Sequence, residues 1–298
     1  MSSSINIRMH PILFNFGPIT LYSFGFFLFL AFFTAIFTIW LHGRREGFDE
    51  EKILDACLFV SLFGVIGGRI GYFLAHRGLF CVLCFFRVSA VPGFSWLAAV
   101  FSGLFGLWVF CSRKKLDFLK FLDLMVLGVA LGEGIGRLGC FFSGTAYGKQ
   151  TTFFWGVSQI GLWGKRHPVQ LLSALSSFFV FWFLLKGKTK RHFAGFIGLV
   201  FFILSGWFLF LLEFLKEEGV YFGGIKFSQV VGFLTGVLGT VWLYKKQKRN
   251  LREDLENIVA RLISLGGKGY ILLSRYTRNV AGIVKSQKFK IQSYKRKL

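Results

Sequence analysis

Seven apolar segments, each long enough to cross a bilayer as a helix, constrain this sequence more than any other feature. A transmembrane helix needs about 20 mostly apolar residues. The chain of 298 residues is 54 % hydrophobic and only 17 % charged, whereas soluble domains contain less apolar and more charged sequence. We therefore predict an all-α integral membrane protein with about seven transmembrane helices. The segments lie near residues 19–41, 53–75, 94–111, 117–136, 168–185, 193–215 and 226–244.

The loops between these segments predict the orientation. Lys and Arg concentrate in the loops 42–52, 112–120 and 186–192 and in the stretch that starts at Lys245. These regions alternate with less basic ones, which an odd number of spans explains. Because cytoplasmic loops carry an excess of Lys and Arg, the N-terminus is expected outside and the C-terminus in the cytoplasm. No cleavable signal peptide is visible before the first apolar segment.

The C-terminal region is strongly basic. Residues 245–298 contain 15 Lys or Arg and three acidic residues, and so carry +12 of the net charge of +22. We divide the chain into a membrane domain, residues 1–244, and a cytoplasmic tail, residues 245–298. Apolar residues from Leu251 to Ile263 recur on one helical face. This amphipathic helix either lies on anionic lipids of the inner leaflet or packs on the protein's own loops. We expect no nucleic-acid partner.

Several ionisable residues fall inside the predicted spans. Each costs about 2.5–3.5 kcal/mol on insertion scales, so such residues usually face the protein interior and mark a site. Glu133 and Arg137 are four residues apart and can pair on one helix face; the alternative to a functional role is a self-neutralised structural pair. Arg69 and Glu213 lie toward the same outer half, although Arg69 could also snorkel to the interface. Asp123 is nearer the cytoplasmic end.

These charges suggest a lipid site. Two guanidinium groups at one depth suit a phosphate, which Arg binds bidentately. We therefore expect a cavity that opens to the outer leaflet and holds an anionic phospholipid headgroup. Gly136, Gly139 and Gly144 follow closely, and glycines at a helix end permit close backbone approach or unwinding.

Two further features bear on the chemistry. His167 precedes Pro168 at the start of the fifth span and is either a general acid or base or a structural residue. Cys81-x-x-Cys84 is a single pair, which is a weak metal signal, and we interpret its members as packing residues rather than a disulfide. The sequence predicts neither a metal site nor a cofactor.

At these residues the sequence resembles the bacterial prolipoprotein diacylglyceryl transferase family over most of residues 10–244. The resemblance rests on the order and spacing of short motifs along seven spans. These are His10-Pro11-Ile12-Leu13-Phe14, Gly17-Pro18, Gly68-Arg69-Ile70-Gly71-Tyr72, Gly136-Arg137-Leu138-Gly139, Trp155-Gly156-Val157, His167-Pro168-Val169-Gln170-Leu171, Glu213-Phe214-Leu215-Lys216 and Gln229.

The resemblance implies a reaction at the bacterial inner membrane. Members of the family transfer diacylglycerol from phosphatidylglycerol to the lipobox cysteine of a prolipoprotein, with glycerol phosphate as the other product. The implied partners are phosphatidylglycerol and a prolipoprotein signal peptide. By this resemblance Arg137 binds the phosphate, and His167, Glu133 or His76 is a candidate base. The candidate phospholipid-binding residues are Arg137, Arg69, Glu213, Gly136, Gly139 and Gln170.

The sequence departs from the family pattern at several positions. Leu97 stands where the family usually has a histidine, Phe24 where it has a tyrosine, and Leu209 where it has an arginine. Cys140 and Thr145 replace an asparagine and the glutamate of the signature. Three hypotheses follow: an active, divergent transferase with a relocated base; a catalytically degenerate member that acts as a lipid-binding or accessory membrane protein; and a small transporter or lipid channel.

Overall fold

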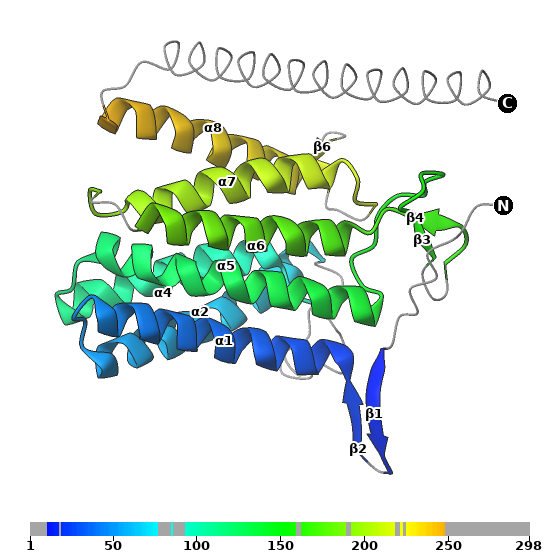
Figure 1. The fold of residues 1–298 in the computed structure, drawn as a ribbon, viewed down its shortest axis with the longest axis horizontal. Coiled ribbons are helices and arrows are strands. Elements are labelled where there is room, and N and C mark those ends of the chain that lie inside the picture. The colour runs from blue at the N-terminus through cyan, green and yellow to red at the C-terminus, as the bar shows by residue number, and fades with distance from the viewer. Residues whose placement is uncertain are drawn as a thin grey trace, which may run out of the picture. The chain divides into compact units, whose positions relative to one another are not determined.

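The structure is a computed structural model, and it describes residues 11–17, 19–76, 85, 93–158, 162–188, 192–217, 221–222 and 225–247. The predicted amphipathic helix after Leu251 and the pair Cys81 and Cys84 lie outside these residues. Within them the chain forms seven long helices and three short two-stranded sheets (Figure 1). The helices are α1 (Ser23–Arg45), α2 (Glu50–Ala75), α4 (Trp96–Lys114), α5 (Phe118–Ser143), α6 (Val169–Lys188), α7 (Phe196–Glu213) and α8 (Phe227–Gln247).

The predicted spans correspond to these helices one by one. Six of them, all but α5, are long and apolar enough to cross a membrane. The all-α membrane architecture predicted from the sequence is therefore confirmed. The chain divides into a compact unit of Met1–Thr240 and a second unit that begins at Val241. Of the second unit the structure describes only the last residues of α8.

Helix α5, which is not among these six, differs because it lies inside the bundle. It packs against α1, α4, α6 and α7, and Leu124, Leu127 and Ala130 are fully buried. A helix largely surrounded by other helices meets little lipid, so it tolerates polar residues that a peripheral span would not. This position accounts for the low apolar content of the fourth predicted span.

Small residues allow α5 to approach α1 closely. A Cβ atom added to Gly128 would lie 2.5 Å from the Ala35 carbonyl oxygen, and one added to Gly132 would lie 3.1 Å from the Ala31 carbonyl oxygen. Helices in membranes associate through such Gly-x-x-x-Gly faces because lipid gives little hydrophobic drive for association. Gly139 continues the contact, since its added Cβ would lie 2.7 Å from the Phe27 Cβ.

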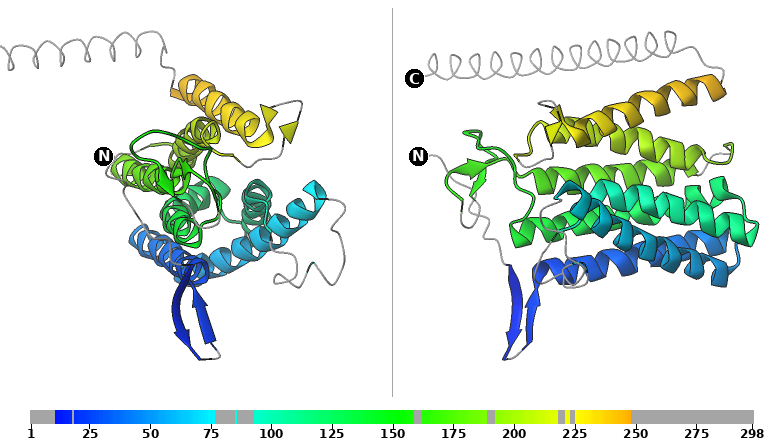
Figure 2. Two further views of the ribbon diagram at one scale, coloured as in Figure 1. Left: turned by 90° about the vertical axis from the view of Figure 1, so that its right-hand side faces the viewer. Right: turned by 180° about the vertical axis from the view of Figure 1, so that it is seen from behind.

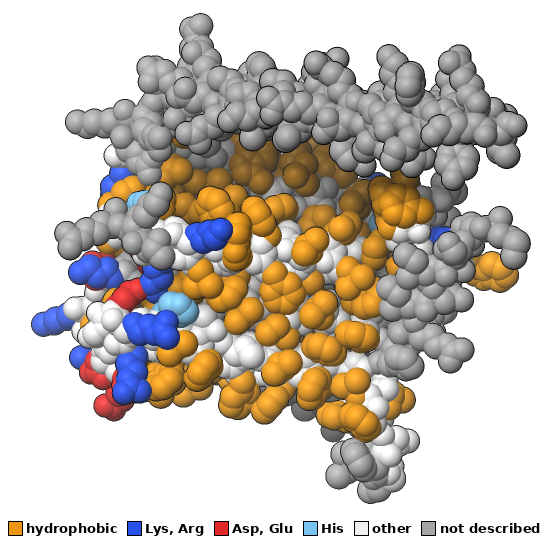
Figure 3. Space-filling model, in the orientation of Figure 1, with side chains coloured by type: hydrophobic (Ala, Val, Ile, Leu, Met, Phe, Trp, Pro, Cys, Tyr) orange, Lys and Arg blue, Asp and Glu red, His pale blue; other side chains and the backbone are white. Residues whose placement is uncertain are grey.

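The loops separate by charge onto the two ends of the bundle. The α1–α2, α4–α5 and α6–α7 connections lie at one end (Figure 1), and Lys and Arg side chains gather there (Figure 3). The strand pairs β1–β2 (Ile12–Phe16, Ile19–Tyr22) and β3–β4 (Val157–Ser158, Lys165–Arg166) lie at the other end. This arrangement agrees with the predicted alternation, and the assignment of the basic end to the cytoplasm stays a prediction.

Two boundaries differ from the sequence prediction. The first span was expected from residue 19, but residues 19–22 form strand β2, whose hairpin projects from the bundle (Figure 2). The fourth was expected to end at 136, but α5 continues to Ser143 and is capped by Gly144 at φ +74°. The glycines of this stretch therefore do not unwind the helix, and Gly139 serves close packing instead.

Asp123 on α5 has a structural explanation. Its carboxylate accepts hydrogen bonds from the backbone N–H groups of Gly195 and Gly198, each at 2.7 Å. These groups belong to the start of α7, where the first N–H groups of a helix lack partners within the helix. The negative charge also complements the positive end of the α7 dipole. Asp123 thus fixes α7 to the central helix.

Candidate functional site

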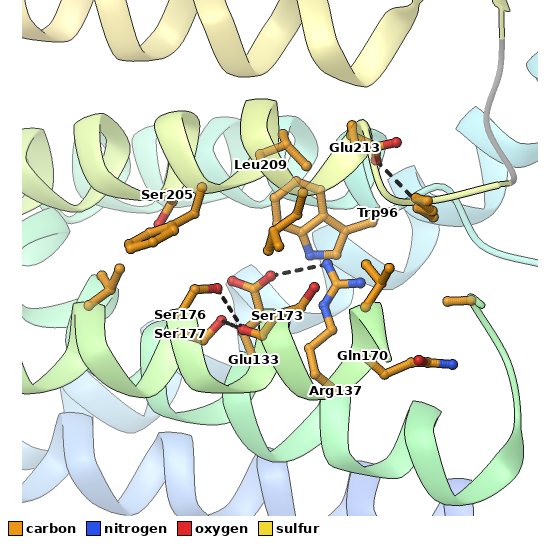
Figure 4. Close-up of a pocket in the computed structure, with 16 residues that line it drawn as sticks. Trp96, Glu133, Arg137, Gln170, Ser173, Ser176, Ser177, Ser205, Leu209 and Glu213 are labelled. Atoms are coloured by element: carbon orange, nitrogen blue, oxygen red, sulfur yellow. Dashed lines mark hydrogen bonds and ion pairs between the residues drawn. The ribbon is translucent and has the colours of Figure 1, made fainter. Parts of the chain in front are cut away.

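A polar pocket lies between α5, α6 and α7, with Trp96 of α4 on one side (Figure 4). It encloses about 640 Å³, including its open mouth. Carboxylates, basic groups and hydroxyls line it together, which is unusual in a bundle of such apolar helices. The lining residues are Trp96, Glu133, Arg137, Ala146, Val169, Gln170, Ser173, Ser176, Ser177, Val180, Ser205, Phe208, Leu209, Leu212, Glu213 and Lys216.

The Glu133–Arg137 pair forms the centre of the pocket. Arg137 donates from Nη2 to Glu133 Oε1 at 3.2 Å, as their spacing on one helix predicted. The guanidinium also lies over the Trp96 ring, with Cζ 5.9 Å from the ring centroid. Only one oxygen of Glu133 is used in this pair, and both side chains are about one-fifth exposed. Arg137 can therefore bind an anion without leaving Glu133.

A second charged group lies at the end of α7. Glu213 Oε1 is 3.5 Å from Lys216 Nζ, and its Oε2 is 3.7 Å from Lys226 Nζ. Lys226 also donates to the backbone carbonyls of Glu213 and Lys216. It therefore caps the C-terminus of α7, where carbonyl groups lack helical partners.

Lys226 was not among the residues predicted from the sequence. It is only 3 % exposed, and this burial lowers the pKa of its ammonium group below the ordinary lysine value, while the Glu213 charge opposes the shift. The structure places it in β6 (Ile225–Lys226). In the sequence it is the first residue of the seventh predicted span, where a lone lysine looks like an ordinary interface residue.

The segment after α5 closes one end of the pocket. Gln170 in the first turn of α6 donates from Nε2 to the Thr145 carbonyl oxygen at 2.8 Å. Buried Arg166 donates to the Gly148 carbonyl oxygen at 3.1 Å and forms an ion pair with Glu217. These bonds connect the residues around Ala146 to the start of α6 and the end of α7.

An apolar groove adjoins the pocket. It lies between α4, α5 and α7 and is lined by aliphatic and aromatic residues such as Leu107, Met125 and Phe202. Its volume is about 1250 Å³ when the space at its open side is included. Phe101 and Val129 of its lining are exposed on the helix surface. Four residues line both spaces, namely Trp96, Glu133, Ser205 and Leu209. The polar pocket and the apolar groove therefore meet at the depth of Glu133.

Not all of the predicted site residues come together. Glu133, Arg137, Gln170 and Glu213 line the pocket. Arg69 does not: it is 2 % exposed and donates to the Phe85 and Gly93 carbonyl oxygens at 3.1 and 2.8 Å. The two arginines therefore do not share a cavity.

The other predicted residues also lie apart from the pocket. His167 accepts a hydrogen bond at Nδ1 from Trp155 Nε1 at 3.1 Å, and His76 stacks on Tyr72. Neither lines the pocket, nor does Gly136 or Gly139. Among the described residues, no group of three or more His, Cys, Asp or Glu side chains is arranged as metal ligands would be.

Two of the departures from the family pattern face these spaces. Leu97 lines the groove, and Leu209 lines both the groove and the pocket. Apolar side chains there extend the groove toward Arg137. Among the described residues, they also leave Glu133 as the one ionisable group that lines both spaces.

Comparison with known proteins identifies the family. The sequence profile of the prolipoprotein diacylglyceryl transferase family matches residues 11–245. The chain belongs to this family. A phosphatidylglycerol–prolipoprotein diacylglyceryl transferase of Clostridium tetani is 28 % identical over 219 residues, which cover 70 % of this chain and 86 % of the relative. The enzyme of the same name from Pseudoalteromonas atlantica is 30 % identical over 260 residues, covering 81 % and 91 %.

Membership in the diacylglyceryl transferase family agrees with the fold. The matched residues include the first six helices and α8 as far as Lys245, the first residue of the basic tail. The six candidate spans and the bacterial family together identify a multi-pass protein of the bacterial inner membrane. The match does not extend into residues 246–298.

Proposed function

We propose that this chain transfers diacylglycerol from phosphatidylglycerol to the lipobox cysteine of prolipoproteins. One observation carries the proposal: a polar pocket centred on Arg137 continues into an apolar groove. This combination matches a phospholipid, whose phosphate needs a cation and whose acyl chains need an apolar space. A soluble polar substrate has no apolar chains that could fill the groove.

Arg137 is the proposed phosphate ligand. Its guanidinium presents several N–H donors, of which one Nη2 donor is used by Glu133. In the reaction, the cysteine sulfur forms a bond to the carbon of the diacylglycerol part that carries the phosphate. The bond between this carbon and the phosphate oxygen breaks. The electron pair stays on the phosphate oxygen, so the leaving glycerol phosphate gains charge next to Arg137. Stabilisation of developing charge by such a fixed donor lowers the barrier.

Glu133 is the proposed base for the thiol proton. A thiol must lose its proton before it attacks, because the thiolate is the nucleophile. Of the three candidate bases, Glu133 lines the pocket and has an oxygen that Arg137 does not use. His167 is bonded to Trp155 outside the pocket lining.

The test uses purified protein, phosphatidylglycerol and a lipobox peptide, with release of glycerol phosphate as the readout. We expect release by the wild type and a loss of about 100-fold or more in Arg137→Met, the magnitude typical of removing one transition-state donor. Arg45→Met removes an exposed arginine at the opposite end of the bundle and is the matched control. Equal rates in the two variants would contradict the phosphate role of Arg137.

The basic tail supports a further part of the proposal. Residues 245–298 carry +12, and juxtamembrane basic segments bind anionic lipid headgroups with about 1 kcal/mol per residue near the surface. We expect a chain truncated after Gln247 to bind anionic vesicles more weakly in low salt while keeping the transfer reaction. Unchanged vesicle binding would argue against this role of the tail.

A further inference from the structure

A second groove lies on the surface of the α2–α4 pair, at the basic end of the bundle where α2 begins and α4 ends (Figure 1). Phe110 in its lining is buried, whereas Leu58 and Leu62 are exposed. The volume of this α2–α4 groove is about 840 Å³ when the space at its open side is included. The lining residues are Asp55, Leu58, Phe59, Leu62, Phe110, Arg113 and Lys114.

The α2–α4 groove has a charged end and an apolar end. On α2 the apolar lining residues follow Asp55 by one and two turns, and on α4 Phe110 precedes Arg113 and Lys114 by one turn. The two helices run in opposite directions, with the Phe59 and Phe110 ring centroids 5.7 Å apart. The three ionisable residues therefore gather at the basic end of the bundle, and the apolar residues continue toward its middle.

The protein does not neutralise the cations of the α2–α4 groove. Four other basic residues at this end of the bundle each form an ion pair with a carboxylate, namely Arg44, Lys52, Lys120 and Lys188. Neither Arg113 nor Lys114 forms an ion pair with a described residue, although Asp55 lines the same groove. Two cations and one carboxylate leave the lining with a net charge of +1, which an anion can compensate.

Charge also selects the occupant of the α2–α4 groove. The chain's own tail carries +12 and a second copy of the chain carries +22, so either would bring more positive charge to a basic groove. An anionic phospholipid brings a negative headgroup for the charged end and an acyl chain for the apolar end. Basic pockets between transmembrane helices on the cytoplasmic side bind anionic headgroups in this way.

We propose that the α2–α4 groove binds an anionic phospholipid from the leaflet at the basic end of the bundle. The headgroup phosphate lies between Arg113 and Lys114, and one acyl chain lies along Leu58 and Leu62. Asp55 weakens the attraction, because it places a negative charge beside the phosphate. This site is separate from the pocket around Arg137 and does not depend on the transfer reaction.

The test maps lipid contacts in bilayers. The full chain is placed in phosphatidylcholine vesicles with either phosphatidylserine or phosphatidylcholine that carries the same photoactivatable acyl chain, and the labelled residues are identified by peptide mass spectrometry. The readout is the ratio of labelling by the anionic probe to labelling by the neutral probe at residues 58–62. The reference is the same ratio at residues 33–37 of α1, equally far along their helix from the basic end, where Phe33 and Phe37 are exposed. We expect a wild-type enrichment of about fivefold, as one net positive charge near anionic lipid provides.

Two variants of the α2–α4 groove should change this enrichment in opposite directions. Arg113→Gln/Lys114→Gln should reduce it to about onefold or below. Asp55→Asn should raise it by up to about fivefold, a gain that damage to the groove would not produce. Lys52→Gln/Lys120→Gln removes two cations at the same end but outside the groove lining, and should leave the enrichment within about twofold of the wild type.

Three results would overturn the proposal. The first is an enrichment near onefold in the wild type. The second is an equal loss in the groove double variant and in Lys52→Gln/Lys120→Gln, which would assign the effect to the general charge of this end of the bundle. The third is an enrichment that is near onefold in the full chain and rises to about fivefold after truncation behind Gln247, which would identify the tail as the occupant.

Discussion

Replacing Asp123 with alanine should strongly destabilise the bundle without touching the pocket. The carboxylate accepts two hydrogen bonds of 2.7 Å from the N–H groups of Gly195 and Gly198, both of which are buried. Each orphaned buried donor costs about 1–3 kcal/mol, and the lost charge at the α7 N-terminus adds about 0.3–1 kcal/mol. We therefore expect the free energy of unfolding to fall by about 2–7 kcal/mol.

The assay is thermal unfolding of the purified protein in detergent. For a unit of this size, about 1 kcal/mol changes the unfolding midpoint by about 2–4 °C, so Asp123→Ala should lower it by about 5–25 °C. Asp55→Ala removes an exposed carboxylate from α2 and should change the midpoint by less than about 2 °C. A midpoint for Asp123→Ala within about 2 °C of the wild type would refute the cap.

Three further changes test other parts of the structure. Gly128→Ala adds a methyl 2.5 Å from the Ala35 carbonyl oxygen and should destabilise the bundle by about 1–3 kcal/mol. Gly136→Ala, whose added methyl would have nothing within 4 Å, should be tolerated. Equal unfolding midpoints of the two variants would contradict the α1–α5 contact. Glu133→Gln should lower turnover by about 100-fold or more relative to Glu46→Gln at the basic end, and a larger loss in His167→Ala would favour the histidine as base. Burial lowers the pKa of Lys226 in the folded state. Between this pKa and the higher pKa of the unfolded chain, the unfolded chain binds more protons, so the stability of the folded protein rises with pH. In Lys226→Met, unfolding midpoints measured above neutral pH should lack this rise.

The membrane fold was predictable because hydropathy and loop charge act locally. Each apolar segment is long enough to span, and a helix is the one way for such a segment to satisfy its own backbone in lipid. The end of α5 was not predictable, because glycines at 136 and 139 are equally compatible with unwinding and with close packing. The contact of Gly139 with Phe27 of α1, which the sequence does not show, favours close helix packing over unwinding.

The candidate site was predictable in part. The Glu133–Arg137 pair follows from helical spacing, and the structure brings Gln170 and Glu213 to the same pocket. Asp123 and Arg69 could not be interpreted from the sequence, since their partners are backbone groups of distant segments, at Gly195 and Gly198 for one and at Phe85 and Gly93 for the other. Lys226 could not be predicted for the same reason, since it donates to the backbone carbonyls of Glu213 and Lys216.

The most direct test of the central claim is the intact mass of a lipobox peptide after incubation with this protein and phosphatidylglycerol. If the chain transfers diacylglycerol, the peptide gains the mass of one diacylglyceryl group on its cysteine, and a peptide with serine at that position gains nothing. A cysteine peptide of unchanged mass, in the presence of protein that binds phosphatidylglycerol, would contradict transfer and leave lipid binding alone as the role of the pocket.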